Sequence, residues 1–468
     1  MATGATARSI DTDYLVVGAG AAGMAFVDAI VDHDPTAHAT LVDRRAAAGG
    51  HWLDAYPFVR LHQASQFYGV ASTRLGSGSV QESGPERGMH ERATGPEICA
   101  YFAEVLEERL LPTGRVELLR GVEYRDGLLV DLASGDVVEP RVRRRVVDAR
   151  YLAPSIPAVG PPPFDVDEDA RVVPAGALPD VADAAAYVVV GSGKTATDAV
   201  VWLLGRGVDP DAIQWVRPRD PWMLDRAAVQ PDPAVFLGMA GTLMAAACDA
   251  SSADELFLRL EDADVMTRID PAVMPTMART PTLGRWELEL LRSVTRVVRD
   301  GHLRRVEPRR LVLDGGEVAV PHGAVVVHCA AYGLHVRPAL PIWGERITLQ
   351  SVRAGFPPFC AALIGYVEGA RHDRPDAEKN ALCPPTPYWS MPADWAAMQG
   401  RGARAAATFM ADPDVALWAH SVLLNPARVP PEESARPEVR AAVERYLEYA
   451  PAGIAGLERI GRDAGVRV

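Results

Sequence analysis

Two glycine-rich segments of this sequence have the residue types and spacing that bind phosphate groups. In the first, DYLVVGAGAAG, Gly18, Gly20 and Gly23 follow an apolar run that predicts a buried strand and precede a predicted helix. Glycines here allow a tight turn, close approach of the backbone to a pyrophosphate and close packing of helix on strand, and the helix N-terminus faces the phosphates. Asp43, followed by Arg44, ends the next predicted strand, where a carboxylate can hold ribose hydroxyls. The segment therefore predicts a dinucleotide site.

The second segment, VVVGSGKTATDAV, places Gly191, Gly193 and the small residue Ala196 in the corresponding positions. It predicts a second dinucleotide site, to which Lys194 and Thr195 at the start of the helix also belong. Loops that bind nucleoside triphosphates also contain Gly-Lys-Thr, but they need a glycine five residues before Gly193, where this chain has a valine. Nucleoside-triphosphate binding is therefore excluded.

Basic residues follow the strand that comes after the second loop, where the first unit has an acid. In Trp-Val-Arg-Pro-Arg these are Arg217 and Arg219. A basic side chain at this point accommodates the 2′-phosphate of NADPH, whereas an acid favours NADH. The pattern favours NADPH, and the alternative is that both are solvated surface arginines.

The elements that position these loops repeat along the chain. Each loop lies between two short apolar runs that predict buried strands, with a helix in between. The first unit is predicted to have strands at 14–17 and 39–42 and a helix at about 20–31, and the second to have strands at 187–190 and 213–216 and a helix at 194–204. Further predictions are a helix at about 96–110 and strands at 116–119, 128–131 and 142–147. A proline-rich stretch at 154–179 is predicted to be the linker between the units.

Composition limits the other classes of function. The 468 residues allow two or three domains, and acidic residues exceed basic ones by 13, which argues against a nucleic-acid or anionic-membrane surface. The five cysteines form no C-x-x-C pair, so no metal site, disulfide framework or redox dithiol is indicated. Because the N-terminus lacks a signal peptide and the apolar run at 235–248 is too short to span a membrane, we expect a cytoplasmic protein that acts on a small molecule. The oligomeric state is left open.

A third segment resembles a known family. Gly49-Gly50-His51-Trp52, followed by Tyr56-Pro57, resembles the G-G-x-W…Y-P segment that lies along the flavin in flavin-containing and Baeyer–Villiger monooxygenases. The two glycine loops occur in the same order and spacing, so the resemblance covers about the first 220 residues. It implies an α/β fold with two Rossmann-like dinucleotide-binding domains, for FAD and NADPH. Gly50, His51 and Trp52 are accordingly expected to contact the cofactor.

The resemblance also implies a reaction. In this family NADPH reduces FAD, the reduced flavin adds O2 to give a C4a-hydroperoxide, and the enzyme oxygenates a nitrogen, sulfur or ketone in a small molecule. A polar residue just after Y-P stabilises that adduct, and counting places His62 there, with Gln63 and Ser65 nearby. Histidine donates hydrogen bonds and titrates near neutral pH, so a proton-transfer role is one hypothesis and a structural role the other.

The resemblance also implies the domain boundaries. Residues 1–155 are expected to begin the FAD domain, 156–324 to form an inserted NAD(P)H domain with a helical insertion at about 232–300, and 325–468 to return to the FAD domain. The segments at 328–333 and 361–369 resemble return strands, and the remaining C-terminal part is expected to be irregular apart from a helix at 437–448.

Two departures leave alternatives open. The family's F-x-G-x-x-x-H-x-x-x-W/F signature is missing before the second loop, and A-T-G is replaced by Asp148-Ala149-Arg150. One alternative is an NAD(P)H-dependent flavin oxidoreductase or dehydrogenase without oxygen insertion, and another is a catalytically inert flavin-binding protein.

Overall fold

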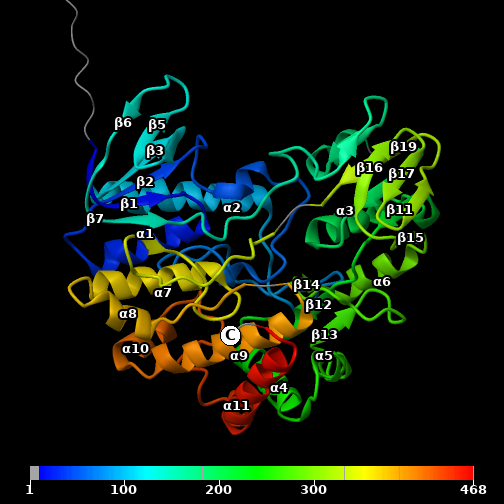
Figure 1. Cartoon of the computed structure of the whole chain (residues 1–468). Coiled ribbons are helices and arrows are strands. Elements are labelled where there is room, and N and C mark those ends of the chain that lie inside the picture. Colours follow the sequence, from blue (N-terminus) through cyan, green and yellow to red (C-terminus); the bar gives the residue numbers. More distant parts are fainter. Residues whose placement is uncertain (1–9, 182, 331–332, 389, 467–468) are drawn as a thin grey trace, which may run out of the picture.

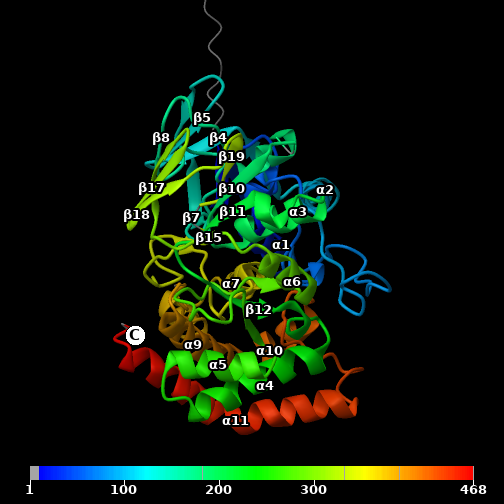
Figure 2. The same ribbon diagram turned by 90° about the vertical axis from the view of Figure 1, so that its right-hand side faces the viewer.

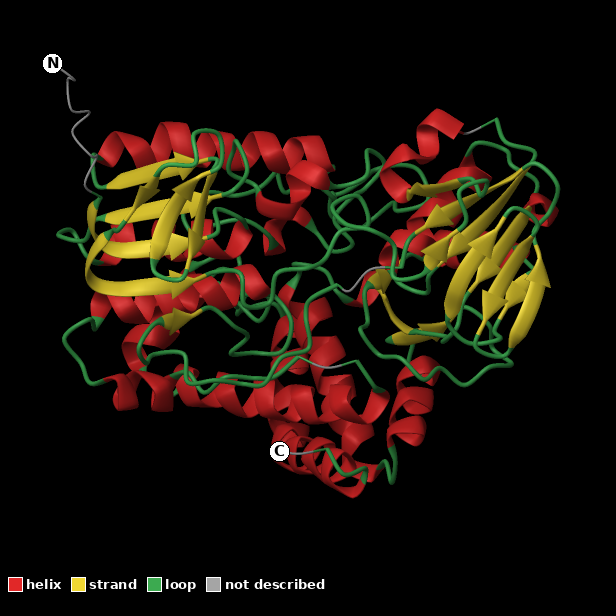
Figure 3. Ribbon diagram, turned by 45° about the horizontal axis from the view of Figure 1, so that its top comes forward, coloured by secondary structure: helices red, strands yellow, loops and turns green. Residues whose placement is uncertain are grey.

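The computed structural model of the chain describes residues 10–181, 183–330, 333–388 and 390–466. Two parallel β-sheets lie on opposite sides of the molecule, and a layer of helices lies below both of them (Figure 1). In Figure 3 the loops that run between the two sheets occupy the middle of the molecule. The chain therefore folds into two sheet units and a helical layer that meet at a central region.

The first sheet has the strand order β20-β7-β1-β2-β3, and all neighbouring pairs are parallel. Its strands are β1 (Asp11–Val17), β2 (Ala39–Asp43), β3 (Val116–Arg120), β7 (Arg141–Asp148) and β20 (Ile347–Thr348). Tyr14 and Val16 face α1 (Ala21–His33), α2 (Gly95–Glu104) and α7 (Pro357–Ala370). Leu15 packs on the other face with the antiparallel strands β4 (Val122–Arg125), β5 (Leu128–Asp131) and β6 (Val137–Val138). Both faces are covered, which explains why β1 is apolar throughout.

The second sheet repeats this arrangement with the order β15-β11-β10-β19-β9. Its strands are β9 (Val172–Pro174), β10 (Ala186–Val190), β11 (Ile213–Val216), β15 (Val297–Val298) and β19 (Ala324–His328). Helices α3 (Lys194–Gly205) and α6 (Arg285–Ser293) cover one face, and the other packs on a sheet of β8 (Asp165–Val166), β16 (Leu303–Glu307), β17 (Arg310–Leu313) and β18 (Gly316–Ala319). The predicted strand–loop–helix units are therefore present at both ends of the molecule.

Three sequence expectations for the connections are wrong. The supposed linker contributes β8 and β9 to the second unit, because β9 pairs with β19. Val325–Val327 pair with β10 in the second sheet, so the chain rejoins the first sheet only at β20. Residues 361–369 lie in helix α7, whose Gly365 packs so closely on α1 that a Cβ would be 2.6 Å from the Phe26 carbonyl oxygen. Short apolar runs do not distinguish buried strands from buried helices, which explains this error.

The C-terminal part is mostly helical, in contrast to the expected irregular structure. It contains α7, α8 (Asp376–Leu382), α9 (Pro392–Met410), α10 (Pro413–Ser421) and α11 (Pro437–Asp463), and α9 and α11 pack with α4 (Pro233–Asp249) and α5 (Ala253–Asp262). Figure 2 shows α4 and α11 side by side at the base of the molecule. Gly453 and Gly456 of α11 permit this, because a Cβ on either would come within 2.5 Å of an α4 carbonyl oxygen. Glycine and alanine contacts of this kind leave a weak apolar pattern in the sequence.

A small third sheet connects the second unit to the helical layer. It consists of β12 (Trp222–Asp225), β13 (Met266–Arg268) and β14 (Thr282–Leu283), so the predicted helical insertion at 232–300 also contains strands. Among the helices that the structure describes, none is both long and apolar enough to cross a membrane.

Candidate functional site

One large cavity of about 1750 Å³ connects the two sheet units and the helical layer. A site for one small ligand is typically about 300–1,000 Å³, so this cavity has room for more than one molecule. Both glycine loops open onto it. The predicted site residues that line it are Gly18, Gly20, Asp43, Arg44, Gly50, His51, Trp52, His62, Gln63, Gly191, Gly193, Lys194, Thr195 and Arg219. Gly23, Ser65 and Arg217 are not part of its lining.

The first glycine loop ends at the open N-terminus of α1. Gly18 has a φ of +112°, a conformation that favours glycine, and a Cβ on Gly23 would lie 1.9 Å from the Gly18 carbonyl oxygen. No side chain caps α1, so the amide N–H groups of its first turn are free to bind an anion. The Asp43 carboxylate holds the loop by accepting hydrogen bonds of 2.9 Å from the backbone N–H groups of Ala19 and Arg45. Asp43 also lines the cavity, and a carboxylate can accept further hydrogen bonds there, such as those that ribose hydroxyls donate.

The second glycine loop has the same design. Gly191 has a φ of +141°, and its carbonyl oxygen accepts a 2.8 Å hydrogen bond from the Trp215 indole N–H. Helix α3 also begins without a side-chain cap. Gly193 has a φ of −92°, which any residue can adopt, and a Cβ there would meet no protein atom within 4 Å. Neither backbone strain nor protein packing requires glycine at this position, so the open space fits a dinucleotide that passes close to the backbone.

Two side chains at the start of α3 connect the two units. Lys194 forms an ion pair with Asp198, and Asp198 accepts a 2.7 Å hydrogen bond from the hydroxyl of Tyr56, which belongs to the first unit. Burial, followed by the negative charge of Asp198, raises the pKa of Tyr56 well above its ordinary value. Tyr56 therefore stays a neutral hydrogen-bond donor to Asp198.

The structure corrects the expectation that Arg217 binds a 2′-phosphate. Its side chain is 1% exposed, packs over the Trp215 ring and forms a 2.8 Å ion pair with Asp220. Burial lowers the pKa of Arg217 to about 10. Side chains of a strand alternate between its two faces, and the chain keeps this alternation at the residue after β11. Arg217, two residues after the buried Trp215, therefore points to the same buried face. Arg219 lines the cavity, and the described residues give its side chain no ion-pair or hydrogen-bond partner.

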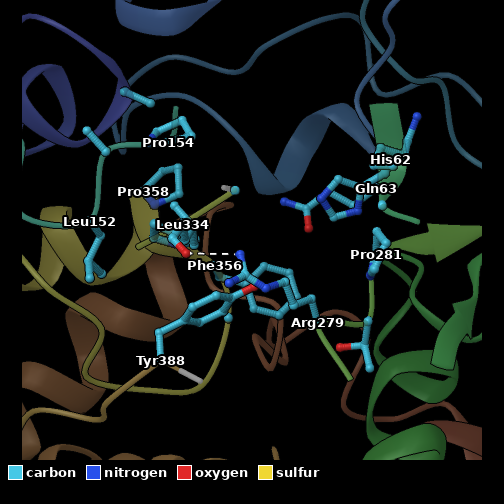
Figure 4. Close-up of a pocket in the computed structure, with 18 of the residues that line it drawn as sticks. His62, Gln63, Leu152, Pro154, Arg279, Pro281, Leu334, Phe356, Pro358 and Tyr388 are labelled. Atoms are coloured by element: carbon cyan, nitrogen blue, oxygen red, sulfur yellow. Dashed lines mark hydrogen bonds between the residues drawn. The ribbon is translucent and has the colours of Figure 1, made fainter. Parts of the chain in front are cut away.

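His62 is fixed in one neutral form. Its Nδ1 accepts a 3.3 Å hydrogen bond from the Thr282 backbone N–H, so the ring proton is on Nε2. Burial lowers the pKa of His62 to about 3, and the positive charges of Lys194, Arg226 and Arg92 contribute in the same direction. In Figure 4, His62 and Gln63 lie together at one side of the pocket. His62 can therefore donate a hydrogen bond into the cavity, but the expectation that it titrates near neutral pH is wrong.

A buried ionic cluster holds the backbone of His62. Arg226 is 1% exposed, donates a 3.1 Å hydrogen bond to the His62 carbonyl oxygen and forms ion pairs with Glu86 and, at 2.6 Å, Glu287. Arg92 completes the cluster with a 2.6 Å pair to Glu86. The Arg226 guanidinium is the largest favourable cause of the lowered pKa of Glu86, about 2. The ion pairs hold Arg226 in position, and Arg226 in turn holds the His62 carbonyl oxygen.

Ser65 has a structural role, which corrects its expected place beside the reaction. It is 1% exposed, accepts a 2.8 Å hydrogen bond from the Ala93 N–H and donates one of 3.1 Å to the Glu91 carbonyl oxygen. The Trp52 indole N–H donates a 2.6 Å hydrogen bond to the Tyr68 hydroxyl, which orients Trp52 in the wall. Burial lowers the pKa of His51, next to Trp52, to about 4. His51 is therefore also neutral at physiological pH.

Arg279 lies below His62 and Gln63 in the view of Figure 4, on the same segment as Pro281, and its side chain extends into the pocket. It donates a 3.2 Å hydrogen bond to the Leu334 carbonyl oxygen, and Tyr388 lies beside it. Cations dominate the described lining although the whole chain has a net charge of −13. The positive residues of the lining are Arg44, Arg45, Arg60, Arg150, Lys194, Arg219, Arg279, Arg304 and Arg353, and its carboxylates are Asp43 and Glu123. The cavity is therefore suited to anionic ligands.

Sequence reasoning missed the ionic cluster and the two isolated cations Arg279 and Arg353. None of these residues belongs to a motif, and each meets its neighbours only through the fold. Glu287 pairs with Arg226, which lies 61 residues earlier in the chain, whereas Arg292 of the same helix donates to the carbonyl oxygens of Arg268 and Ile269.

Comparison with known proteins gives close relatives without a described activity. The chain is 43% identical over 443 residues to "Uncharacterized protein Rv2000" of Mycobacterium tuberculosis, a match that covers 93% of this chain and 82% of the relative. "Uncharacterized protein Mb2023" of Mycobacterium bovis matches with the same identity and coverage. No protein-family model matches the chain.

Solved structures also match the chain, at low sequence identity. A closed structure of cyclohexanone monooxygenase has a TM-score of 0.47 at 15% identity and covers 98% of this chain and 99% of its own. Bacillithiol disulfide reductase from Staphylococcus aureus has a TM-score of 0.43 at 10% identity, over 77% of this chain and 96% of its own. At these scores and identities the likeness says nothing about chemistry.

Proposed function

The chain belongs to the same family as the mycobacterial proteins Rv2000 and Mb2023, and we propose that it is an FAD- and NADPH-dependent monooxygenase of a small molecule. The observation that carries this proposal is the pair of open glycine loops that share one cavity with a fixed hydrogen-bond donor, His62, between them. Two dinucleotide sites on one cavity allow a hydride to pass directly from one bound cofactor to another.

FAD is assigned to the first unit. The free N–H groups at the start of α1 would bind the pyrophosphate, Asp43 the ribose hydroxyls, and His51 and Trp52 would lie along the ring system. Arg44 is exposed at this end of the cavity and would contribute positive charge. FAD, when bound, accepts a hydride from the nicotinamide and in its reduced form activates O2.

NADPH is assigned to the second unit. The start of α3 and the open space at Gly193 would bind its pyrophosphate. Arg219, which has no ion-pair or hydrogen-bond partner among the described residues, would bind the 2′-phosphate. Because Lys194 is already paired with Asp198, its charge is partly neutralised, so Arg219 becomes the main determinant of the preference for NADPH.

The protein's own residues would orient the reaction. His62 would donate its Nε2–H to a reacting oxygen. Because burial lowers the pKa of His62 to about 3, the ring would remain neutral, with its one proton on Nε2, throughout the physiological pH range. Arg279, which lines the same pocket, would attract a carbonyl or anionic oxygen with the guanidinium N–H groups that do not bind the Leu334 carbonyl oxygen. His62 and Arg279 would thereby place a substrate oxygen between them.

The test measures reduction of the flavin and incorporation of oxygen into the product in separate steps. The purified protein is examined for flavin absorbance and is then titrated without oxygen, in parallel, with NADPH and NADH. We expect NADPH to bleach the flavin at lower concentration than NADH. After addition of ¹⁸O₂ and a panel of aliphatic ketones, sulfides and amines, we expect one labelled oxygen in the product of at least one class for each NADPH oxidised.

The alternatives give different results in the same experiment. Bleaching by NADPH with all the consumed oxygen recovered as hydrogen peroxide, across the whole panel, would establish an oxidoreductase without oxygen insertion. Bound flavin that neither NADPH nor NADH bleaches would indicate a catalytically inert flavin-binding protein. Absence of flavin after reconstitution with FAD would refute the assignment of the first unit.

A further inference from the structure

The cavity extends beyond the cofactor loops into the helical layer, where its walls are apolar. Phe236, Met239 and Leu243 of α4, Met398 of α9 and Leu447 of α11 line this end. Leu447 is 63% exposed, so this end reaches the surface. Its shape and chemistry fit an apolar molecule that enters between the helices.

Arg353 is the cation at this apolar end. It lies in the segment between β20 and α7, with its guanidinium carbon 5.7 Å from the centre of the Phe236 ring and 5.9 Å from that of Phe356. It donates a 3.2 Å hydrogen bond to the Asn425 side-chain oxygen. No carboxylate among the described residues forms an ion pair with it, and the groups that interact with its charge are Cys360 and Tyr446.

A charged group in apolar surroundings without a counterion is unfavourable, and burial lowers the pKa of Arg353. Other enclosed arginines of this protein, such as Arg217 and Arg226, have carboxylate partners. Arg353 has no carboxylate partner among the described residues and, unlike Arg217 and Arg226, lines the cavity. A ligand in the cavity would supply the missing negative charge.

We propose that Arg353 binds the carboxylate of an otherwise apolar substrate whose body lies between α4, α9 and α11. The two phenylalanine rings and Asn425 occupy part of the guanidinium surroundings and leave an edge for a ligand, and two parallel N–H groups match the two oxygens of a carboxylate. The substrate class is thus a carboxylic acid with an aliphatic or aromatic body.

This inference rests on the proposed function, because the acid is the molecule to be oxidised. Phe356 supports the connection, since its ring contacts Phe67 of the first unit at 5.3 Å and Phe236 at 5.8 Å. Phe356 also lines the pocket that holds His62 and Gln63 (Figure 4). A carboxylate on Arg353 would direct the other parts of the substrate past Phe356 toward that pocket.

The test measures binding without turnover. Decanoate and 1-decanol, which share an apolar body, are titrated by calorimetry into the full chain, its Arg353→Met variant and an Arg374→Met control. Arg374 is exposed and does not line the cavity. A hydrogen bond to a charged group changes affinity by about 10- to 100-fold. We therefore expect the wild type and the Arg374→Met control to bind decanoate about 10 to 100 times more tightly than Arg353→Met does. The affinity for decanol should be the same in all three.

A second measurement does not depend on ligand. Because Arg353 has no counterion to lose, Arg353→Met should unfold at a urea concentration equal to or above that of the wild type. A lower midpoint would indicate a structural role and contradict the proposal. Equal affinity of the wild type for decanoate and decanol, or competition of NADP⁺ or FAD with decanoate, would also overturn it.

The FAD content of each sample separates the two proposals. Protein that binds no FAD but prefers decanoate through Arg353 would refute the proposed function and leave a carboxylate site. Protein that holds FAD and is reduced by NADPH, but shows no carboxylate preference, would refute only the inference about the substrate.

Discussion

Replacing Gly193 with alanine tests whether the second glycine loop is shaped for a ligand. A Cβ at this position meets no protein atom within 4 Å, and the φ of −92° suits alanine. Alanine stabilises by about 0.4–1 kcal/mol through the unfolded state. Gly193 is the N-cap of α3, and alanine is less favourable than glycine at an N-cap by a similar amount of roughly 0.5–1 kcal/mol. The two effects offset each other, so we expect the free energy of unfolding to change by less than about 1 kcal/mol.

Binding of NADP⁺ should respond very differently. A methyl group forced into a filled contact costs about 1–3 kcal/mol, which corresponds to a dissociation constant raised roughly 5- to 150-fold. The constant is measured by titration calorimetry, with urea unfolding and FAD content determined on the same samples. Gly205→Ala is the matched control, because Gly205 ends the same helix, also has no atom within 4 Å of a Cβ and does not line the cavity. Affinity within twofold of the wild type, or equal weakening in the control, would refute the reasoning.

Three further outcomes are expected. Gly23→Ala should prevent FAD binding and lower stability, because the added Cβ would lie 1.9 Å from the Gly18 carbonyl oxygen. Flavin absorbance measures the FAD content and thermal unfolding measures the stability, and a stable variant that holds flavin would contradict this prediction. Glu287→Gln should lower the free energy of unfolding, measured with urea, by about 3–5 kcal/mol, because Arg226 would lose one of its two carboxylate partners. A decrease of less than about 1 kcal/mol would contradict this prediction. His62 has a pKa of about 3 in the folded state, so the unfolded chain binds the extra proton between about pH 6.5 and 3 and stability falls as the pH falls through that range. His62→Gln should reduce the loss of stability between pH 7.5 and 5, and an unchanged loss would contradict the assignment.

The sequence predicted the parts of the fold that depend on local order. Strand, glycine loop and helix follow one another within about 20 residues in each unit, so their residue types suffice. It failed at Arg217 and Ser65. The motif does not reveal the turn that brings Asp220 to Arg217, only three residues away, or the later loop that brings Glu91 to Ser65. His62 was found by counting from a motif, but its protonation state depends on Thr282 and Arg226, which are far away in the chain. Local sequence therefore identified positions, and the fold determined their chemistry.

The ionic cluster behind His62 also has a mechanical consequence. Glu86 and Arg92 belong to the first unit, whereas Arg226 and Glu287 come from segments that pack on the second unit and the helical layer. Swinging one unit away from the other as a rigid body would break these pairs and leave desolvated charges, a change that is strongly unfavourable. The ionic cluster thus opposes rotation of one unit against the other. Under the proposed function, the nicotinamide would have to reach the flavin by moving between units that keep a fixed arrangement.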